Sequence, residues 1–255
     1  MKKLLAALGF FTRIPVWRFC KIPTDYYTRV VDLWSATGLI TGGITALSLW
    51  GAFQFFPPVL AIIIAFSFRL ILTGALHEDG LADFLDGFGG GKDKSRILEI
   101  MKDSSIGSYG VLGLIIYYLL LTSCILYIPA DIAPLIIFAA DPWSKFCATN
   151  IVSFLPYARK QEEAKSKLIY RRTTVPAIFL SLILGVLPSL FLPVVIWLAL
   201  IPPLAVVAIM ILYIRYKIGG YTGDCCGATA LLCELSFYVS AVAMFQLQPS
   251  LVTIF

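Results

Sequence analysis

Long apolar runs alternate with short polar patches along the whole chain. A helix needs about 20 apolar residues to cross a bilayer, and seven runs reach or approach that length. They are residues 31–52, 58–76, 109–128, 133–155, 174–191, 194–214 and 226–247. The pattern therefore predicts an all-α fold, that of a polytopic integral membrane protein with about seven transmembrane helices.

The polar patches between these runs alternate in charge. Four of them hold 18 of the 20 Lys and Arg residues: 1–30, 77–108, 156–173 and 215–225. The other connections and the C-terminal tail hold none, and Arg69 and Lys145 lie inside apolar runs. Because Lys and Arg collect on the cytoplasmic side of membrane proteins, we expect a cytoplasmic N-terminus and an external C-terminus.

The first residues, "MKKLLAALGFFTRIP", combine a basic start with a short apolar run but lack a small-residue cleavage site. They predict an uncleaved amphipathic segment on the inner face rather than a signal peptide. Residues 92–103 predict a second interfacial helix, because Ile97, Leu98 and Met101 would share one apolar side. No repeat or soluble domain interrupts the pattern, so residues 1–255 are interpreted as one membrane domain.

The composition agrees with a membrane location. The chain is 59% hydrophobic and 14% charged, with a net charge of +5. Topology and attraction to anionic lipid account for this charge, so it implies the bilayer as a partner and no nucleic acid. The pattern is compatible with an oligomer and does not specify one.

Seven of the 15 acidic residues gather in "HEDGLADFLDGFGGGKDKSRILEIMKDSSIGSYG", which begins at His77. Asp79, Asp83 and Asp86 are spaced i, i+4 and i+7, so on a helix they span only roughly 60° of one face. Like charges on one stripe repel each other, and a bound cation explains them best. Carboxylates without His or Cys partners select hard ions, so the stripe predicts Mg²⁺ or Mn²⁺. The alternative is a solvated helix face at a membrane exit.

A glycine run, Gly87 and Gly89–Gly91, follows this stripe. Such a run would end the helix and let backbone amides approach a ligand closely. Candidate ligands follow on the next helix: Arg96 and Lys102 for phosphate, Glu99 and Asp103 for a second metal, with an ordinary salt bridge as the alternative for Glu99. Metal, glycines and basic residues are what phosphoryl transfer requires, so residues 77–108 are predicted to be a cytoplasmic catalytic segment.

Two further patches fall on the same predicted side of the membrane. The segment "GGYTGDCCGA" at 219–228 offers Thr222, Gly223 and Asp224 as a second phosphate or metal contact. Arg159 in the 156–173 loop is a candidate substrate contact, and a solvated basic loop is the alternative. His77 is the only histidine and is interpreted as a hydrogen-bonded structural residue.

Charged residues inside apolar runs are costly and usually have partners. Asp141 and Lys145 stand at i and i+4, which predicts a structural salt bridge. Arg69 is expected to reach Asp79 or Asp83, or to extend to the membrane interface.

Together these segments resemble the cobalamin synthase family, the adenosylcobinamide-GDP ribazoletransferases of prokaryotic inner membranes. The resemblance covers nearly the whole chain and rests on "FFTRIP" near the N-terminus, "TGALHEDGLADFLDGFGGG" at 73–91, "RILEIMKDSSIGSYG" at 96–110, "PYAR" at 156–159 and "GGYTGDCCGA". Enzymes of this family join α-ribazole, or its 5′-phosphate, to adenosylcobinamide-GDP and release GMP. The resemblance therefore implies a Mg²⁺-dependent transferase of cobalamin biosynthesis, in the cell inner membrane, with its active site on the cytoplasmic face.

The resemblance also maps residues of the family's motifs onto this chain. Its acidic motif falls on His77, Asp79, Gly80, Asp83 and Asp86, and its second motif on Glu99, Lys102, Asp103 and Gly107. Glu78 stands where a hydrophobic residue is common and adds a candidate ligand, whereas Ser105 stands where an Arg is common and removes a phosphate contact. The predicted site has Asp79, Asp83, Asp86 and Asp103 as catalytic residues, the same four with Glu78 as metal ligands, and Gly80, Gly87, Arg96, Lys102, Ser104, Gly107, Arg159, Thr222, Gly223 and Asp224 as cofactor- and substrate-binding residues.

Two other functions stay open at this point. The segment "DFLDG" also resembles the start of the CDP-alcohol phosphotransferase signature of phospholipid synthesis, although the downstream spacing differs. A divalent-cation or corrinoid transporter is the alternative from a different class. It would place the carboxylates at mid-membrane depth rather than at the cytoplasmic rim.

Overall fold

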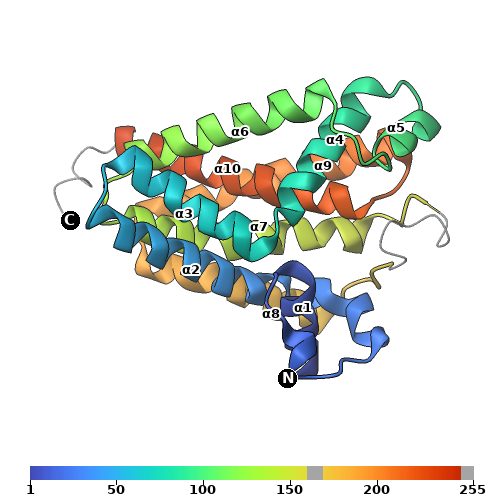
Figure 1. Cartoon of the computed structure of the whole chain (residues 1–255), viewed down its shortest axis with the longest axis horizontal. Coiled ribbons are helices and arrows are strands. Elements are labelled where there is room, and N and C mark those ends of the chain that lie inside the picture. Colours follow the sequence, from blue (N-terminus) through green and yellow to red (C-terminus); the bar gives the residue numbers. More distant parts are fainter. Residues whose placement is uncertain (160–168, 248–255) are drawn as a thin grey trace.

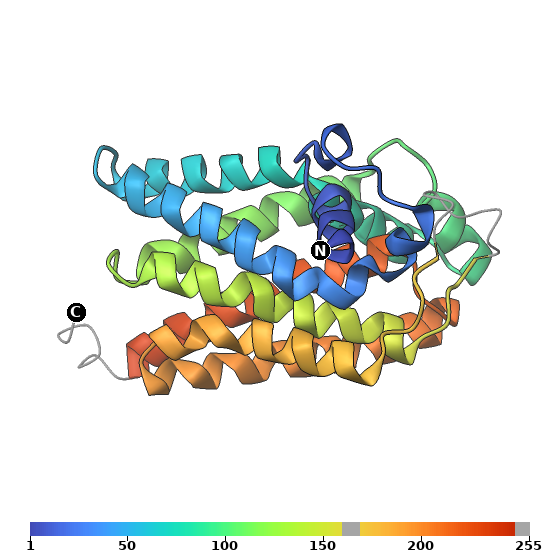
Figure 2. The same cartoon turned by 90° about the horizontal axis from the view of Figure 1, so that it is seen from below.

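A computed structural model describes residues 1–159 and 169–247 of the chain. Its long helices run side by side as one bundle (Figures 1 and 2). They are α2 (Trp34–Phe53), α3 (Pro58–Thr73), α6 (Ser108–Tyr127), α7 (Ala133–Phe154), α8 (Val175–Val186), α9 (Ile201–Ile218) and α10 (Gly223–Leu247). Each corresponds to one of the seven predicted apolar runs.

Shorter elements extend or connect these helices. Three 3₁₀ segments adjoin the bundle helices: η2 (Thr24–Leu33) before α2, η4 (Leu187–Phe191) after α8 and η5 (Val194–Leu200) before α9. The remaining short elements are α1 (Lys2–Phe11), η1 (Val16–Arg18), α4 (Leu76–Gly90) and α5 (Lys94–Ile100). The predicted amphipathic segments at the N-terminus and at 92–103 are thus helical, as α1 and α5.

The prediction of an all-α membrane protein is confirmed. Within the described ranges, four helices are long and apolar enough to cross a membrane: Thr24–Phe53, Ser108–Tyr127, Val194–Ile218 and Gly223–Leu247. A fifth is obtained if α3 and α4 are counted as one bent span. The number seven therefore stays a prediction, because α3 and α8 are short and α7 carries polar residues.

Helix α7 lies at the centre of the bundle, and α2, α8, α9 and α10 all pack against it. Its neighbours shield it from lipid, so it tolerates Asp141 and Lys145, which form the predicted ion pair. The Thr41 hydroxyl of α2 donates to Asp141 at 2.6 Å. At Gly42 of the same helix, a Cβ would lie 2.9 Å from the Asp141 Cβ, so the close approach of α2 to α7 requires glycine there.

A second set of buried charges joins α3, α4, α6 and α10. Arg69 pairs with Glu234 at 2.5 Å and lies 3.7 Å from Glu78. The Tyr238 hydroxyl donates to Glu234 at 2.6 Å, and the Tyr118 hydroxyl donates to Glu78 at 3.2 Å. Arg69 therefore does not extend to the membrane interface. It pairs with Glu234 and Glu78 rather than with Asp79, because α10 brings a carboxylate to the guanidinium inside the bundle.

The chain turns sharply between α3 and α4, whose axes differ by 90°. Gly74 ends α3 with φ +65°, and Ala75 also takes the left-handed conformation, with φ +56°. The Arg13 backbone N–H donates to the Leu72 carbonyl at 2.7 Å, which ties "FFTRIP" to this turn. As a result α4 leaves the direction of the bundle and, with α5, covers one of its ends (Figure 1).

The described parts of the four Lys- and Arg-rich patches lie toward the same end of the bundle, on the right in Figures 1 and 2. We call this the basic end. The turns at 54–57 and 128–132 lie at the other end, as does the end of α10. The fold thus separates basic from uncharged connections in the way that the sequence predicts.

Candidate active site

Two glycine contacts bring α4 and the start of α10 together at the basic end. A Cβ on Gly80 would lie 3.1 Å from the Asp224 carbonyl oxygen, and one on Gly227 would lie 3.3 Å from the His77 Cα. Larger side chains would push the two backbones apart. This crossing places Asp79 of α4 and Asp224 of α10 beside one pocket.

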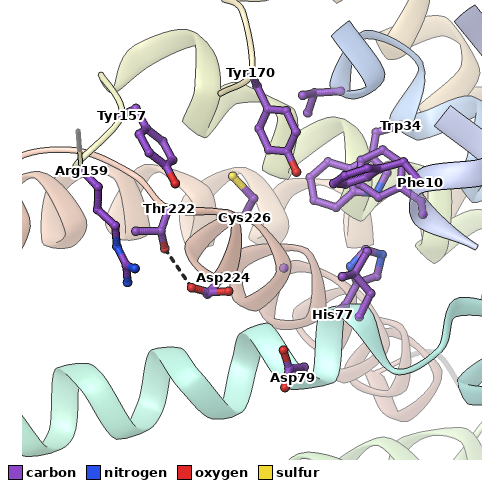
Figure 3. Close-up of a pocket in the computed structure, with 15 residues that line it drawn as sticks. Phe10, Trp34, His77, Asp79, Tyr157, Arg159, Tyr170, Thr222, Asp224 and Cys226 are labelled. Carbon is purple, nitrogen blue, oxygen red and sulfur yellow. Dashed lines mark hydrogen bonds between the residues drawn. The ribbon is translucent and has the colours of Figure 1, made fainter. Parts of the chain in front are cut away.

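A short backbone bridge brings the "PYAR" segment to the same place. The Tyr221 N–H donates to the Pro156 carbonyl at 2.8 Å, and the Ala158 N–H donates to the Tyr221 carbonyl at 2.9 Å. A Cβ at Gly220 would overlap the Pro156 carbonyl oxygen, so this bridge also depends on a glycine. Through the bridge, Arg159 arrives beside Thr222 and Asp224 (Figure 3).

We call the resulting cavity the aspartate pocket. It holds about 890 Å³, counting the part that is open to solvent. Its walls are Phe10, Phe11, Val31, Trp34, Leu76, His77, Asp79, Tyr157, Arg159, Tyr170, Thr222, Gly223, Asp224, Cys226 and Gly227. Figure 3 shows Arg159, Thr222 and Asp224 on one side of the pocket, with Tyr157 next to them, and Phe10, Trp34 and His77 on the other side.

The polar side of the aspartate pocket carries Asp79, Asp224, Thr222 and Arg159. The Thr222 hydroxyl donates to Asp224 at 3.4 Å, the contact drawn in Figure 3. The Asp79 side chain is exposed in the pocket and makes no hydrogen bond or ion pair with another residue of the described ranges. A guanidinium beside carboxylates is an arrangement suited to a phosphate that carries a cation.

The aromatic side of the pocket is formed by four rings. Phe11 and Trp34 stack with their centroids 4.9 Å apart, and Phe10 meets Tyr170 edge-on at 5.9 Å. Burial raises the pKa of Tyr170 well above its usual value, so its hydroxyl stays protonated. We call these four side chains, with His77, the aromatic end.

Two further cavities lie at the basic end: one shares Arg159 with the aspartate pocket, and the other shares Glu99 with that cavity. The first, the lysine groove, is lined by Asp93, Lys94, Ser95, Leu98, Glu99, Lys102, Ala158 and Arg159. The second is lined by Asp86, Gly90, Arg96, Glu99, Ile100, Asp103, Ser105, Ile106, Gly107, Ser108 and Tyr109. Arg159 borders both the aspartate pocket and the lysine groove, and its guanidinium donates to the Leu98 carbonyl of α5 at 2.9 Å.

Asp86 has a local role that the sequence did not reveal. Its carboxylate accepts the backbone N–H groups of Gly107 at 2.7 Å and of Gly110 at 2.8 Å, and so caps the N-terminus of α6. A Cβ on Gly107 would lie 2.5 Å from the Asp86 Oδ1. Gly107 was predicted to bind substrate, and the structure shows that it makes room for this cap.

The other predicted carboxylates do not converge on one point. Asp83 is buried on α4, one turn beyond Asp79, whereas Glu78 turns into the bundle toward Tyr118 and Arg69. Asp103 is exposed, and hydrogen bonds from Ser105 lower its pKa below the usual value. Among the described residues, no three His, Cys, Asp or Glu side chains are placed to hold one metal ion. The predicted metal ligands therefore stay a prediction.

Several residues of the glycine run and of the segment beyond it, which were predicted to contact a ligand, make packing or ion-pair contacts within the protein. Helix α4 continues through Gly87 and ends at Gly90, and a Cβ on Gly87 would overlap Met101 of the segment after α5. Arg96 forms the ordinary salt bridge with Glu99, at 2.8 Å. Lys102 lines the lysine groove, and Ser104 is exposed at the end of α5's segment.

Comparison with known proteins identifies the relatives of this chain. The family model described as cobalamin-5-phosphate synthase matches residues 3–242. The chain belongs to this family. Curated relatives named adenosylcobinamide-GDP ribazoletransferase include one from Shewanella sp. (strain W3-18-1), which is 35% identical over 92% of this chain and 91% of its own length. The relative from Shewanella woodyi is 35% identical over 91% and 92%, and that from Shewanella oneidensis 34% over 91% and 90%. No solved structure matches.

The segments that indicate the cobalamin-5-phosphate synthase family lie together in the fold. "FFTRIP" supplies Phe10 and Phe11 to the aspartate pocket, and the acidic motif supplies His77 and Asp79. "PYAR" and "GGYTGDCCGA" supply the opposite wall, while "RILEIMKDSSIGSYG" forms parts of the two neighbouring cavities. Segments that are distant in the sequence thus line three cavities that are linked by the shared residues Arg159 and Glu99.

Proposed function

We propose that this protein joins α-ribazole, or its 5′-phosphate, to adenosylcobinamide-GDP with release of GMP, the step that assembles the lower ligand of cobalamin. The observation that carries the proposal is the meeting of four family segments around the aspartate pocket, with the fifth in the adjoining cavities. The names of the relatives, which match over nine-tenths of their length, supply the substrates.

The donor atoms of the pocket fit a Mg²⁺ ion that is held partly by the protein and partly by the substrate. Mg²⁺ is commonly held by one or two carboxylates together with substrate phosphates rather than by a complete protein cage. Asp79 and Asp224 line the same pocket, and no third acidic, His or Cys ligand joins them in the described ranges. We therefore assign these two as the residues that would hold a cation arriving with the diphosphate, with Asp83 behind them on α4. When bound, the cation would neutralise charge on the diphosphate and on departing GMP.

The protein's own residues then position the two substrates for an in-line displacement. A ribose hydroxyl of the acceptor loses its proton and bonds to the phosphorus attached to the corrinoid linker, while the bond from that phosphorus to the GMP oxygen breaks. Arg159 stands between the aspartate pocket and the lysine groove, where it would neutralise phosphate charge together with Lys102. Asp86 would act indirectly, by fixing α6 against α4.

The segregation of basic connections supports a location in the cell inner membrane with the basic end in the cytoplasm. The corrinoid donor carries a diphosphate and would reach the aspartate pocket from that side. A transporter would need a different arrangement. Its carboxylates would line a permeation path through the bundle, whereas Asp79 and Asp224 lie at the basic end.

The direct test is product formation by the purified protein. Adenosylcobinamide-GDP and α-ribazole are expected to yield GMP and a cobalamin, and chelation of divalent cations is expected to stop the reaction. CDP-diacylglycerol with an alcohol acceptor should give no product; release of CMP in its place would indicate the phospholipid enzyme. Passage of cations or corrinoid into liposomes, without any GMP, would indicate a transporter and overturn the proposal.

A further inference from the structure

The aromatic end of the aspartate pocket has features that the carboxylates do not explain. Trp34 is 1% exposed and His77 is 6% exposed, yet the Trp34 indole N–H and the His77 Nε2 have no hydrogen-bond partner among the described residues. A buried polar group without a partner costs free energy. Two such groups in the wall of one pocket therefore point to a ligand that pairs with at least one of them.

The surroundings of these two groups restrict the ligand's chemistry. The rings of Phe11 and Trp34 stack, Phe10 and Tyr170 meet edge-on, and the His77 ring lies 5.4 Å from that of Trp34. Such a wall suits a flat aromatic group, because bases stack favourably on aromatic side chains. The carboxylates of the pocket lie on its other side, as Figure 3 shows for Asp79 and Asp224.

We infer that the aromatic end binds the base of the acceptor nucleoside, with the Trp34 indole N–H donating to the base's free ring nitrogen. This inference rests on the proposed function and names which substrate occupies this end. The base of α-ribazole is a dimethylbenzimidazole, which is flat and largely apolar. One of its ring nitrogens is bonded to the sugar, and the other can accept one hydrogen bond.

Guanine, the base of the donor, matches this wall less well. It presents several N–H donors that need acceptors on the protein, and the aromatic end offers few: the Trp34 indole only donates, which leaves the Tyr170 hydroxyl oxygen and one His77 ring nitrogen. The lysine groove has Asp93 and Glu99 as acceptors and lies across Arg159 from the aspartate pocket. With the acceptor base in the aromatic end, its ribose would extend toward Asp79 and Asp224, where the phosphorus chemistry is proposed.

The first test deletes the indole N–H but keeps an aromatic ring. Trp34→Phe is expected to raise the KM for α-ribazole about 10-fold, the effect of losing one hydrogen bond to a buried group. The KM for adenosylcobinamide-GDP should stay within about twofold of wild type, on the same scale. Trp197→Phe is the matched control, because Trp197 lies in η5, outside the pocket lining, and its indole N–H already donates to the Leu192 carbonyl at 3.3 Å. It should change neither KM.

A second test removes the hydrogen bond from the ligand side. An acceptor analogue with C–H in place of the free ring nitrogen should bind wild type about 10-fold more weakly than α-ribazole. It should bind wild type and Trp34→Phe equally. Phe10→Leu is expected to weaken both nucleosides alike, since it removes a stacking surface and leaves the indole N–H. Calorimetric binding of each nucleoside to the protein in detergent measures these affinities without turnover.

The outcomes separate this inference from the proposed function. Wild type could form no cobalamin and still bind α-ribazole with this dependence on Trp34. The proposed reaction would then be wrong, and the inferred binding site for the base would be supported. If turnover is normal and Trp34→Phe raises only the KM for the corrinoid donor, the aromatic end takes guanine and the inference is wrong. It is also wrong if both KM values stay unchanged. Should Trp34→Phe fail to fold, the affinities of α-ribazole and of the analogue for wild type and for Phe10→Leu test the inference. Equal binding of the two nucleosides to wild type would show that no hydrogen bond is donated to the free ring nitrogen.

Discussion

The carboxylates in the bundle and those in the aspartate pocket differ in their partners. Inside the bundle, Glu234 and Asp141 each have a cationic partner and a hydroxyl donor. In the aspartate pocket, the exposed Asp79 has no such partner among the described residues. Paired charges in the bundle hold helices together, whereas a carboxylate that faces a cavity can bind what enters it. Partners, rather than sequence position, thus distinguish the acids that hold the bundle together from the acid that is proposed to act in the pocket.

Substitution in the aspartate pocket should give the largest change in activity. Asp79→Asn is expected to lower kcat/KM by about 100-fold or more, a typical effect of removing one electrostatic contact to the reacting group, and Asp83→Asn is expected to act in the same direction. The thermal unfolding temperature should stay as in wild type, because Asp79 contributes no internal pair. Asp131→Asn, at an exposed position of the 128–132 turn, is the control and should keep full activity. Activity of Asp79→Asn within threefold of wild type would end its assigned role.

Substitution inside the bundle should lower stability and leave activity nearly unchanged, the opposite of the effect expected in the pocket. Glu234→Gln leaves Arg69 buried without its main counter-charge and is expected to cost about 3 kcal/mol of stability. Activity per folded molecule should change little. The double variant Arg69→Met with Glu234→Gln should recover only part of the loss, because it removes the unpaired guanidinium but leaves the buried Glu78 without its neighbouring cation. Thermal unfolding in detergent measures both, and an undiminished stability of Glu234→Gln would contradict the structural role of the pair.

The glycine crossing between the two regions should show an intermediate effect. Gly227→Ala places a methyl group against the His77 backbone of α4, at 3.3 Å from its Cα. The displacement of α4 from α10 is expected to lower kcat/KM by about 10-fold, since small misplacements of reacting groups are costly. Gly51→Ala on α2 is the matched control, because nothing lies within 4 Å of its added Cβ. Equal activity of the two variants would show that the crossing does not position the carboxylates.

Asp86 should behave as a structural residue despite its place on the stripe. Asp86→Asn keeps one acceptor oxygen for two N–H donors, and a lost helix cap typically costs about 1 kcal/mol. The unfolding temperature should fall slightly, with kcat/KM reduced less than threefold, on the scale of roughly half a kcal/mol. A loss of activity as large as that of Asp79→Asn would instead make Asp86 a ligand.

The sequence predicted those features that depend on local spacing. Apolar runs gave all the long helices, and the i, i+4, i+7 spacing put three aspartates on α4. It failed where a partner is distant in the chain: Arg69 and Glu234 are 165 positions apart, and Asp86 and Gly110 are 24 apart. No local pattern indicates such pairs.

The aromatic end was missed for a related reason. Phe10, Trp34 and Tyr170 belong to separate segments, and each is an ordinary aromatic residue in a chain that is 14% aromatic. Only their assembly around His77 makes them a wall. The left-handed Ala75 at the α3–α4 turn was equally hidden, since an alanine gives no signal of that conformation.

The position of Asp224 bears on how the enzyme matures. Helix α10 follows all the other described helices in the chain, and it carries the carboxylate and the glycine that close the pocket against α4. A nascent chain in which only the earlier helices had inserted would still lack Thr222 and Asp224 on the polar side of the aspartate pocket. If Asp224 acts as proposed, activity is expected only after α10 has joined the bundle, so that protein with α10 not yet inserted would leave the substrates unconsumed.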